Sequence, residues 1–303
     1  MYEPNPLEIL FLTNFSDSCY RAIPAVARIA DELLVQLTIL HCYDPSRRSR
    51  EEAESLVTSF FPEADHYGIC RRMAMECSPL KAVQEFRQFG ASGLLLAPAS
   101  DPFGIPRLGR ASLRCQLIRE SSTPVWTIGP NVQLNKLHSP TRNVACWIDL
   151  ASRDKTHIKL AFEYAWKLDA KLHFLHALPE IDEGSLSLPL HYDKPLHAEG
   201  AAEEIREIVG WVPIHPEIHV NTGNSARTIA RMLRKCEADV LFIGRGKSIQ
   251  RRLIGSRLNP VVDQSPCPVI CVDGESMSIP IWKLERGAAF QASQEKTGID
   301  VRR

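Results

Sequence analysis

Glycines, a serine and several basic residues gather in one segment of the second half of the chain. The segment reads Gly244-Arg-Gly246-Lys-Ser-Ile-Gln-Arg-Arg-Leu-Ile-Gly255-Ser256 and directly follows the apolar run that ends at Ile243. Glycine lets a backbone approach a phosphate closely, and Ser256 can offer a hydroxyl and an N–H group at the start of a helix. The side chains expected to add positive charge there are Arg245, Lys247, Arg251, Arg252 and Arg257. We therefore expect a phosphate-binding loop; the alternative is a glycine-bearing turn with a solvated basic face.

Gly246-Lys247-Ser248 does not complete a Walker-type P-loop. That motif needs a glycine five residues before its second glycine, and Leu241 stands at that position. Any phosphate cradle here must be of another kind.

The elements that must position this loop repeat along the chain. An apolar run at 8–13 is followed by Asn14, and an apolar run at 143–148 is followed by Asp149. His41 and His176 close the next apolar runs, and their separation equals that of Asn14 from Asp149. The strand–helix–strand unit is therefore predicted to occur twice without a gap.

Later elements repeat with small insertions. Helical spacing pairs 22–33 with 158–168, 79–89 with 225–236, and 113–119 with 258–263, and apolar strands pair 37–41 with 172–176, 93–97 with 239–243, and 123–128 with 267–272. Strands that alternate with helices favour a parallel sheet covered on both faces. The predicted fold is α/β, with two tandem doubly wound, Rossmann-like domains.

The domain boundaries follow from this repeat. We expect a first domain at 1–130, a polar linker at 131–142, a second domain with the glycine loop at 143–274, and a C-terminal tail at 275–303. The segments 44–54 and 178–199 are expected to be exposed excursions after the second strand of each half.

Composition limits the possible partners. The 36 basic and 36 acidic residues give a formal net charge of zero, which provides no global attraction to nucleic acid or to an anionic membrane. No run approaches the roughly 20 apolar residues of a membrane span, and the start MYEPNPLEIL lacks the pattern of a signal peptide. We expect a cytoplasmic protein whose nine cysteines are reduced and mostly buried, because no C-x-x-C pair or disulfide framework occurs.

The pattern of Asp149, His176-Ala177, Gly244-x-Gly246, Gly255-Ser256 and Pro268-Val269 resembles the universal stress protein family, and the resemblance covers both halves. It implies an adenine nucleotide alpha hydrolase-like fold. Members with the loop G-x-x-G-x9-G-[S/T] bind ATP, with the Asp after the first strand near the nucleoside. Here both spacings are one residue shorter, with one residue between Gly244 and Gly246 and eight between Gly246 and Gly255.

The resemblance implies a set of nucleotide-binding residues. It places Asp149 at the adenosine end, Ala177 at the adenine wall, and the loop residues around the phosphates, while any Mg²⁺ would arrive with the ATP. The full expected set is Asp149, Ala177, Ile243, Gly244, Gly246, Gly255, Ser256 and Arg257. For Asp149 the alternative is a helix N-cap or turn residue.

The first half departs from this pattern. Asn14 stands at the Asp position, and Ala97-Pro98-Ala99-Ser100 replaces the beginning of the glycine loop. We expect this half to bind nucleotide weakly or not at all. In the family the final strands commonly pair across a dimer. The segments 125–128 and 269–272 are therefore expected to pair within this chain and form an internal pseudo-dimer. The whole chain could then be a monomer or a dimer.

Other chemistry is less supported by the sequence. Proline at 213 and 216 argues against a helix that would bring His215 and His219 together as metal ligands. His41 and His176 are interpreted as histidines at strand ends whose ring nitrogens are hydrogen-bonded within the protein, and not as catalytic residues. No nucleophile with a base is found, so ATP hydrolysis would be slow at most. The two hypotheses are a nucleotide-binding regulatory protein and a nucleotide-free interaction scaffold with a vestigial loop.

Overall fold

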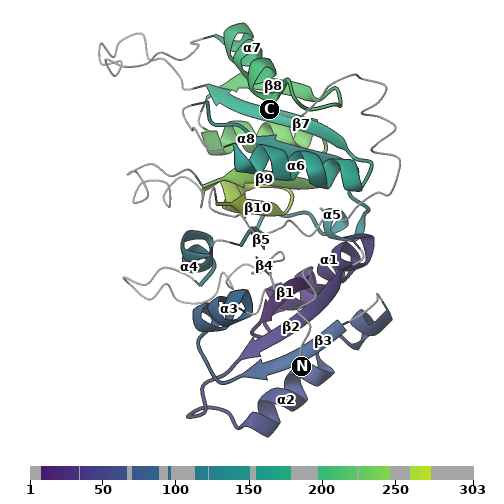
Figure 1. The fold of residues 1–303 in the computed structure, drawn as a ribbon, viewed down its shortest axis with the longest axis vertical. Coiled ribbons are helices and arrows are strands. Elements are labelled where there is room, and N and C mark those ends of the chain that lie inside the picture. Colours follow the sequence, from purple (N-terminus) through teal and green to yellow (C-terminus); the bar gives the residue numbers. More distant parts are fainter. Residues whose placement is uncertain are drawn as a thin grey trace, which may run out of the picture.

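The computed structural model describes residues 8–33, 35–66, 70–88, 95–96, 113–121, 123–150, 155–178, 197–223, 225–245 and 260–273. The strands in these ranges form one sheet in the order β3-β2-β1-β4-β5-β10-β9-β6-β7-β8 (Figure 1). Their bounds are β1 (Glu8–Thr13), β2 (Gln36–Cys42), β3 (Cys70–Met75), β4 (Leu95–Leu96), β5 (Val125–Thr127), β6 (Asn143–Trp147), β7 (Lys171–Leu178), β8 (Glu217–Thr222), β9 (Val240–Gly244) and β10 (Val269–Val272).

The two halves share one topology. In the first half the spatial order is third, second, first, fourth and fifth strand, and the second half repeats that order from β8 to β10. All pairings within each half are parallel. This is the doubly wound α/β fold predicted from the repeat, and it is present twice.

The halves join through their last strands. β10 pairs antiparallel with β5, with Ile270 opposite Trp126. The predicted internal pseudo-dimer is therefore confirmed, and pairing covers an edge that each half alone would expose.

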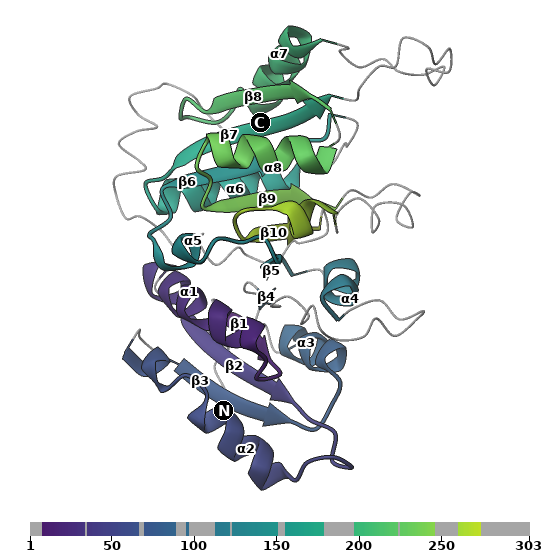
Figure 2. The ribbon, with the colours of Figure 1, turned by 180° about the vertical axis from the view of Figure 1, so that it is seen from behind.

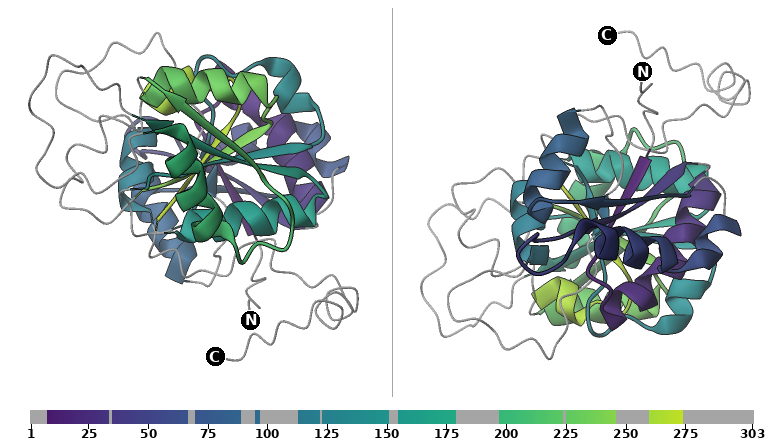
Figure 3. Two further views of the ribbon diagram at one scale, coloured as in Figure 1. Left: turned by 90° about the horizontal axis from the view of Figure 1, so that it is seen from above. Right: turned by 90° about the horizontal axis from the view of Figure 1, so that it is seen from below.

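Helices cover both faces of this sheet (Figures 2 and 3). They are α1 (Asp17–Leu33), α2 (Arg50–Ser59), α3 (Pro79–Gln88), α4 (Leu113–Glu120), α5 (Leu134–His138), α6 (Thr156–Lys167), α7 (Ala198–Val209) and α8 (Ser225–Lys235), with a 3₁₀ helix at Pro62–His66 and a helical turn at 260–264. One core cluster combines apolar residues of α1, α2, α6 and α7, and the other combines those of α3, α4 and α8. Each cluster contains residues of both halves, so packing is continuous across the junction.

The segment predicted as a polar linker is anchored by packing and by charge. It contains α5, whose Leu137 is buried. Lys136 Nζ lies 2.9 Å from Asp239 Oδ1, and the backbone N–H groups of Arg142 and Asn143 donate to Asp239 Oδ2 at 2.8 and 2.9 Å. A buried carboxylate satisfied in this way fixes the entry of the chain into β6.

The two expected excursions contain regular structure. α2 begins within the first one, with Ser49 and Glu52 forming a capping box, and α7 begins at the end of the second. All nine cysteines are free, as predicted. The described helices include none with the length and apolarity that a membrane crossing requires.

Candidate functional site

The second half changes strand order between β6 and β9, and open α/β sheets bind ligands beyond the carboxyl ends of their strands at such a point. Trp147 is the register partner of Ile243, so both strands end at the same level. Asp149 follows β6 and Gly244 ends β9. The sequence-predicted Asp and the first glycine of the predicted loop therefore reach the same edge from adjacent strands.

The backbone next to Asp149 is held firmly. The N–H of Ile148 donates to the carbonyl of Leu175 at 2.9 Å, and the Ile148 carbonyl lies 2.7 Å from His176 Nδ1. Asp149 itself is exposed. The N-cap of α6 is Lys155, so Asp149 does not cap that helix, and the N-cap alternative does not hold there. An exposed carboxylate beside this anchored backbone can accept hydrogen bonds from a ligand hydroxyl.

Gly244 lies against an imidazole. A Cβ placed on Gly244 would be 2.5 Å from Nδ1 of His157, a residue in the first turn of α6. His157 is 3% exposed, and its Nε2 lies 3.1 Å from the Trp147 carbonyl, so the ring bridges the ends of β6 and β9. The φ angle of Gly244 is one that any residue can adopt, so space, rather than backbone freedom, calls for glycine here.

Ala177 and Ile243 occupy different environments. Ala177 is half-buried on β7, opposite Asn221 of β8. Ile243 is 1% exposed and belongs to the core cluster beneath α8. At Ile243 the side chain packs in the core, so contact with a ligand would have to come through the main chain.

Arg245 was expected to add positive charge to the loop, but its guanidinium is already paired at the junction between the two halves. Its guanidinium donates to the carbonyls of Ile118 and Ser121, at the C-terminal end of α4 in the first half. It also lies 2.9 Å from Asp273 Oδ2. Carbonyls at the C-terminal end of a helix and a carboxylate both attract a cation. Arg245 therefore fastens the two halves together.

Residues 140–273 match the family model described as universal stress protein family. The second half of the chain is therefore similar to the universal stress protein family. A comparison with curated proteins found no match.

Solved structures show how far the fold extends. A universal stress protein from Archaeoglobus fulgidus DSM 4304 aligns with a TM-score of 0.64 and 17% identity, covering 88% of this chain and 96% of its own. A functionally unknown protein from Pseudomonas aeruginosa PAO1 aligns with a TM-score of 0.57 and 17% identity, covering 88% and 92%. The cytoplasmic domain of a prokaryotic cation chloride cotransporter aligns with a TM-score of 0.54 and 12% identity, covering 90% and 97%. At these identities the likeness concerns the fold, which alone does not fix function.

Four of the residues expected to bind nucleotide, Gly246, Gly255, Ser256 and Arg257, lie outside the described residues, as do Lys247, Arg251 and Arg252. The described part of the second half thus places Asp149, Ala177, Ile243 and Gly244 around the strand ends. The phosphate-binding role of the loop stays a prediction.

The equivalent edge of the first half is organised differently. Asn14 Oδ1 accepts from the N–H of Ser16 at 3.1 Å and from the thiol of Cys19 at 3.2 Å, which commits it to the turn before α1. The Phe15 ring packs on His41 at a centroid distance of 4.4 Å, and Arg48 Nη1 lies 3.0 Å from His41 Nε2. In the first half, Asn14 and His41 are therefore already engaged by neighbouring side chains and backbone of the same half.

Two features escaped the sequence analysis. One is His157. The separation of Asn14 from Asp149 is the same as that of Ala22 from His157, so the repeat already places a large polar residue where the first half has a small one. The other is a trio of His173, Glu217 and His219 on β7 and β8. His219 lies within β8, where Glu217 and His219 share one face because side chains alternate along a strand.

Proposed function

We propose that this chain is a cytoplasmic regulatory protein whose second half binds ATP or a related adenine nucleotide. The single observation that carries the proposal is the placement of Asp149, exposed and held by its neighbours, beside the end of β9 at the topological switch point. Asp149 and Ala177 would face the adenosine. Gly244, Gly246, Gly255, Ser256 and Arg257 would hold the phosphates through N–H groups, a hydroxyl and one positive charge.

The match of residues 140–273 to the universal stress protein family model supports this assignment. Family members that keep the glycine loop bind ATP, and this chain keeps three glycines and the serine, with each spacing one residue shorter. Among the described residues the only cluster of possible metal ligands lies between β7 and β8, away from these strand ends, so Mg²⁺ would come with the phosphates.

Regulation suits this site better than turnover. Phosphoryl transfer needs a residue that positions the attacking water, and the sequence offers no candidate beside the loop. Arg245 immediately precedes Gly246 and grips the end of α4 in the other half. A nucleotide bound by the loop would therefore act next to a contact that spans both halves, and through that contact binding could change the conformation of the chain.

Calorimetric titration of the full chain with ATP and Mg²⁺ tests the proposal. One site per chain is expected, with affinity lost in Gly255→Asp, which places a carboxylate where phosphate would lie, and reduced at least about tenfold in Asp149→Ala. Asn14→Ala is the matched control, because it removes the equivalent side chain in the first half and should leave affinity unchanged. Absence of heat with the wild-type chain for ATP, ADP and AMP would overturn the proposal.

A nucleotide-free scaffold is the second candidate, and one observation favours it. His157 takes the space beside Gly244, and the guanidinium of Arg245 contacts the first half, so two residues of the predicted loop, Gly244 and Arg245, already serve packing. Mass spectrometry of small molecules released from the purified protein separates the candidates. Stoichiometric adenine nucleotide excludes the scaffold, while a nucleotide-free protein that also gives no heat with ATP favours it.

A further inference from the structure

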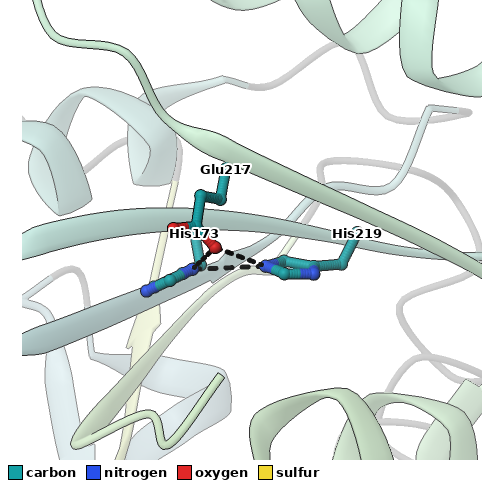
Figure 4. Close-up of side chains that lie close together, drawn as sticks. All are labelled: His173, Glu217 and His219. Atoms are coloured by element: carbon teal, nitrogen blue, oxygen red, sulfur yellow. Dashed lines mark hydrogen bonds and ion pairs between the residues drawn. The ribbon is translucent and has the colours of Figure 1, made fainter. Parts of the chain in front are cut away.

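Two histidines and a glutamate converge between β7 and β8, away from the strand ends that carry the nucleotide proposal. Figure 4 shows His173 of β7 with Glu217 and His219 of β8. His173 Nδ1 lies 3.2 Å from His219 Nε2 and 3.4 Å from Glu217 Oε2, and His219 Nε2 lies 3.7 Å from Glu217 Oε2. The three atoms thus form a small triangle whose members all have lone pairs to offer a cation.

The size of this triangle suits a small divalent ion. Zinc takes His nitrogen and carboxylate oxygen at about 2.0–2.2 Å in tetrahedral geometry, which puts the ligand atoms about 3.3–3.5 Å apart. The measured separations of 3.2, 3.4 and 3.7 Å bracket that spacing.

Asn143, at the start of β6, sets the tautomer of His173. Its Oδ1 lies 3.3 Å from His173 Nε2. A carbonyl oxygen can only accept, so in the tautomer that donates from Nε2 to Asn143, Nδ1 keeps its lone pair toward His219 and Glu217. Metal-binding histidines are commonly held in this way, with the second nitrogen donating to an oxygen. Burial lowers the pKa of both His173 and His219, which favours the neutral form that binds metal.

We propose that His173 Nδ1, His219 Nε2 and Glu217 Oε2 form a binding site for Zn²⁺ that is separate from the nucleotide site. Graded exposure makes the site reachable: the side chain of His173 is 4% exposed, that of His219 19% and that of Glu217 58%. Water or an external ligand fills the fourth position. Two nitrogens and one oxygen favour zinc over Mg²⁺ and Ca²⁺, which prefer all-oxygen sites.

The position of the trio gives the metal a mechanical effect. β8 is the last strand of the sheet and is partly exposed, while β7 is mostly buried beside it. His173 is the register partner of Glu217, and His219 lies opposite Leu175. An ion held by both strands therefore fastens the edge strand to its neighbour, and metal binding adds to the stability of the folded chain.

Zinc competition against a chromophoric chelator, with the full chain and no added nucleotide, tests the site. Wild type is expected to take one equivalent of Zn²⁺, and the double variant Glu217→Gln/His219→Asn should lose it by at least about tenfold in affinity. His215→Asn is the matched control, because His215 is exposed two residues before Glu217 and is absent from the trio. Asn143→Ala should weaken binding about tenfold through loss of the contact that orients His173.

The visible spectrum of bound Co²⁺ distinguishes the trio from a site formed by cysteine thiolates elsewhere in the chain. Co²⁺ in the trio gives the visible bands of a tetrahedral ion without thiolate charge-transfer absorption. The proposal would be overturned by any of three results: thiolate charge-transfer bands in the cobalt spectrum, zinc binding retained by the double variant, or less than stoichiometric zinc bound by the wild type. Circular dichroism of the zinc-free proteins verifies that the variants fold. Zinc should raise the melting temperature of wild type and of His215→Asn, but not that of the double variant, if the ion links β8 to β7.

Discussion

The imidazole of His157 lies where a side chain at Gly244 would have to go. A Cβ on Gly244 would be 2.5 Å from Nδ1 and 2.8 Å from Cε1 of that ring. Atoms that are not bonded do not approach so closely, so one of the two positions must stay small. In the first half the equivalent positions carry Ala22 and Pro98, with the small residue on the helix instead of at the strand end.

Gly244→Ala should therefore destabilise the chain by about 1–3 kcal/mol through overpacking. His157→Ala should cost a similar amount, because it leaves a cavity and removes the contact with the Trp147 carbonyl. In the double variant the alanine at 244 fits the vacated space, so the two losses should not add. Chemical denaturation of the four proteins measures this coupling, and additive losses would show that the ring and the glycine are independent.

The same variants also separate packing from ligand binding at Gly244. If the glycine serves only His157, the double variant should bind ATP as the wild type does. If the backbone of Gly244 also approaches phosphate, affinity should stay reduced in the double variant although stability is recovered. Titration calorimetry of the double variant, compared with wild type, distinguishes the two roles.

Arg245→Met should destabilise the junction of the two halves. The variant leaves Asp273 without its cation and removes the donor to the last carbonyls of α4, at a cost of about 2–4 kcal/mol. Arg119→Met, an exposed position on α4, is the control and should change stability by less than about 0.5 kcal/mol. A variant as stable as wild type but weaker in ATP binding would mean that Arg245 turns toward phosphate in solution.

The repeat let the sequence predict the topology because the buried strands are strongly apolar. The runs at 8–13 and 143–148 and their following helices lie where they were expected. The pairing of β5 with β10 also follows from the family resemblance, and the structure confirms it. What the sequence could not supply was the direction of side chains that meet from distant elements, such as Arg245 on the carbonyl of Ile118.

The third strand of each half was missed for a physical reason. β3 (CRRMAM) and β8 (EIHVNT) are the outermost strands of the sheet and are only partly buried. Without burial on both faces, neither needs the continuous apolar run that marks the central strands. The trio on β7 and β8 was missed with them, because its three members become neighbours only when β8 pairs with β7 in the observed register.

Gly129→Ala should be among the most damaging small substitutions in the junction. A Cβ at Gly129 would clash with the backbone carbonyl oxygen of Val262, and a backbone atom cannot rotate away as a side chain does. The loss should exceed about 2 kcal/mol, as expected for a forced backbone shift. Gly210→Ala is the matched control, because its new Cβ would meet nothing closer than 3.4 Å and its φ of −58° suits alanine. Equal melting temperatures for the two variants would contradict this close approach.

Acid should destabilise the first half through His41. Burial, the largest cause, and the positive charge of Arg48 lower the pKa of His41 in the folded chain, while the hydrogen bond with the Thr13 carbonyl acts in the opposite direction. The unfolded chain therefore takes up a proton at His41 at higher pH than the folded chain does, so stability falls as pH drops through about 6.5 toward the lower folded value.

Urea denaturation of wild type and His41→Gln between pH 8 and pH 5 measures this contribution. Glutamine removes the titration and can still hydrogen-bond, so the free energy of unfolding of the variant should fall less steeply with acid than that of wild type. The difference between the two slopes is limited to one proton, about 1.4 kcal/mol per pH unit. A steeper fall in the variant would mean that His41 is stabilised in its charged form, which the nearby guanidinium of Arg48, 3.0 Å from Nε2, argues against.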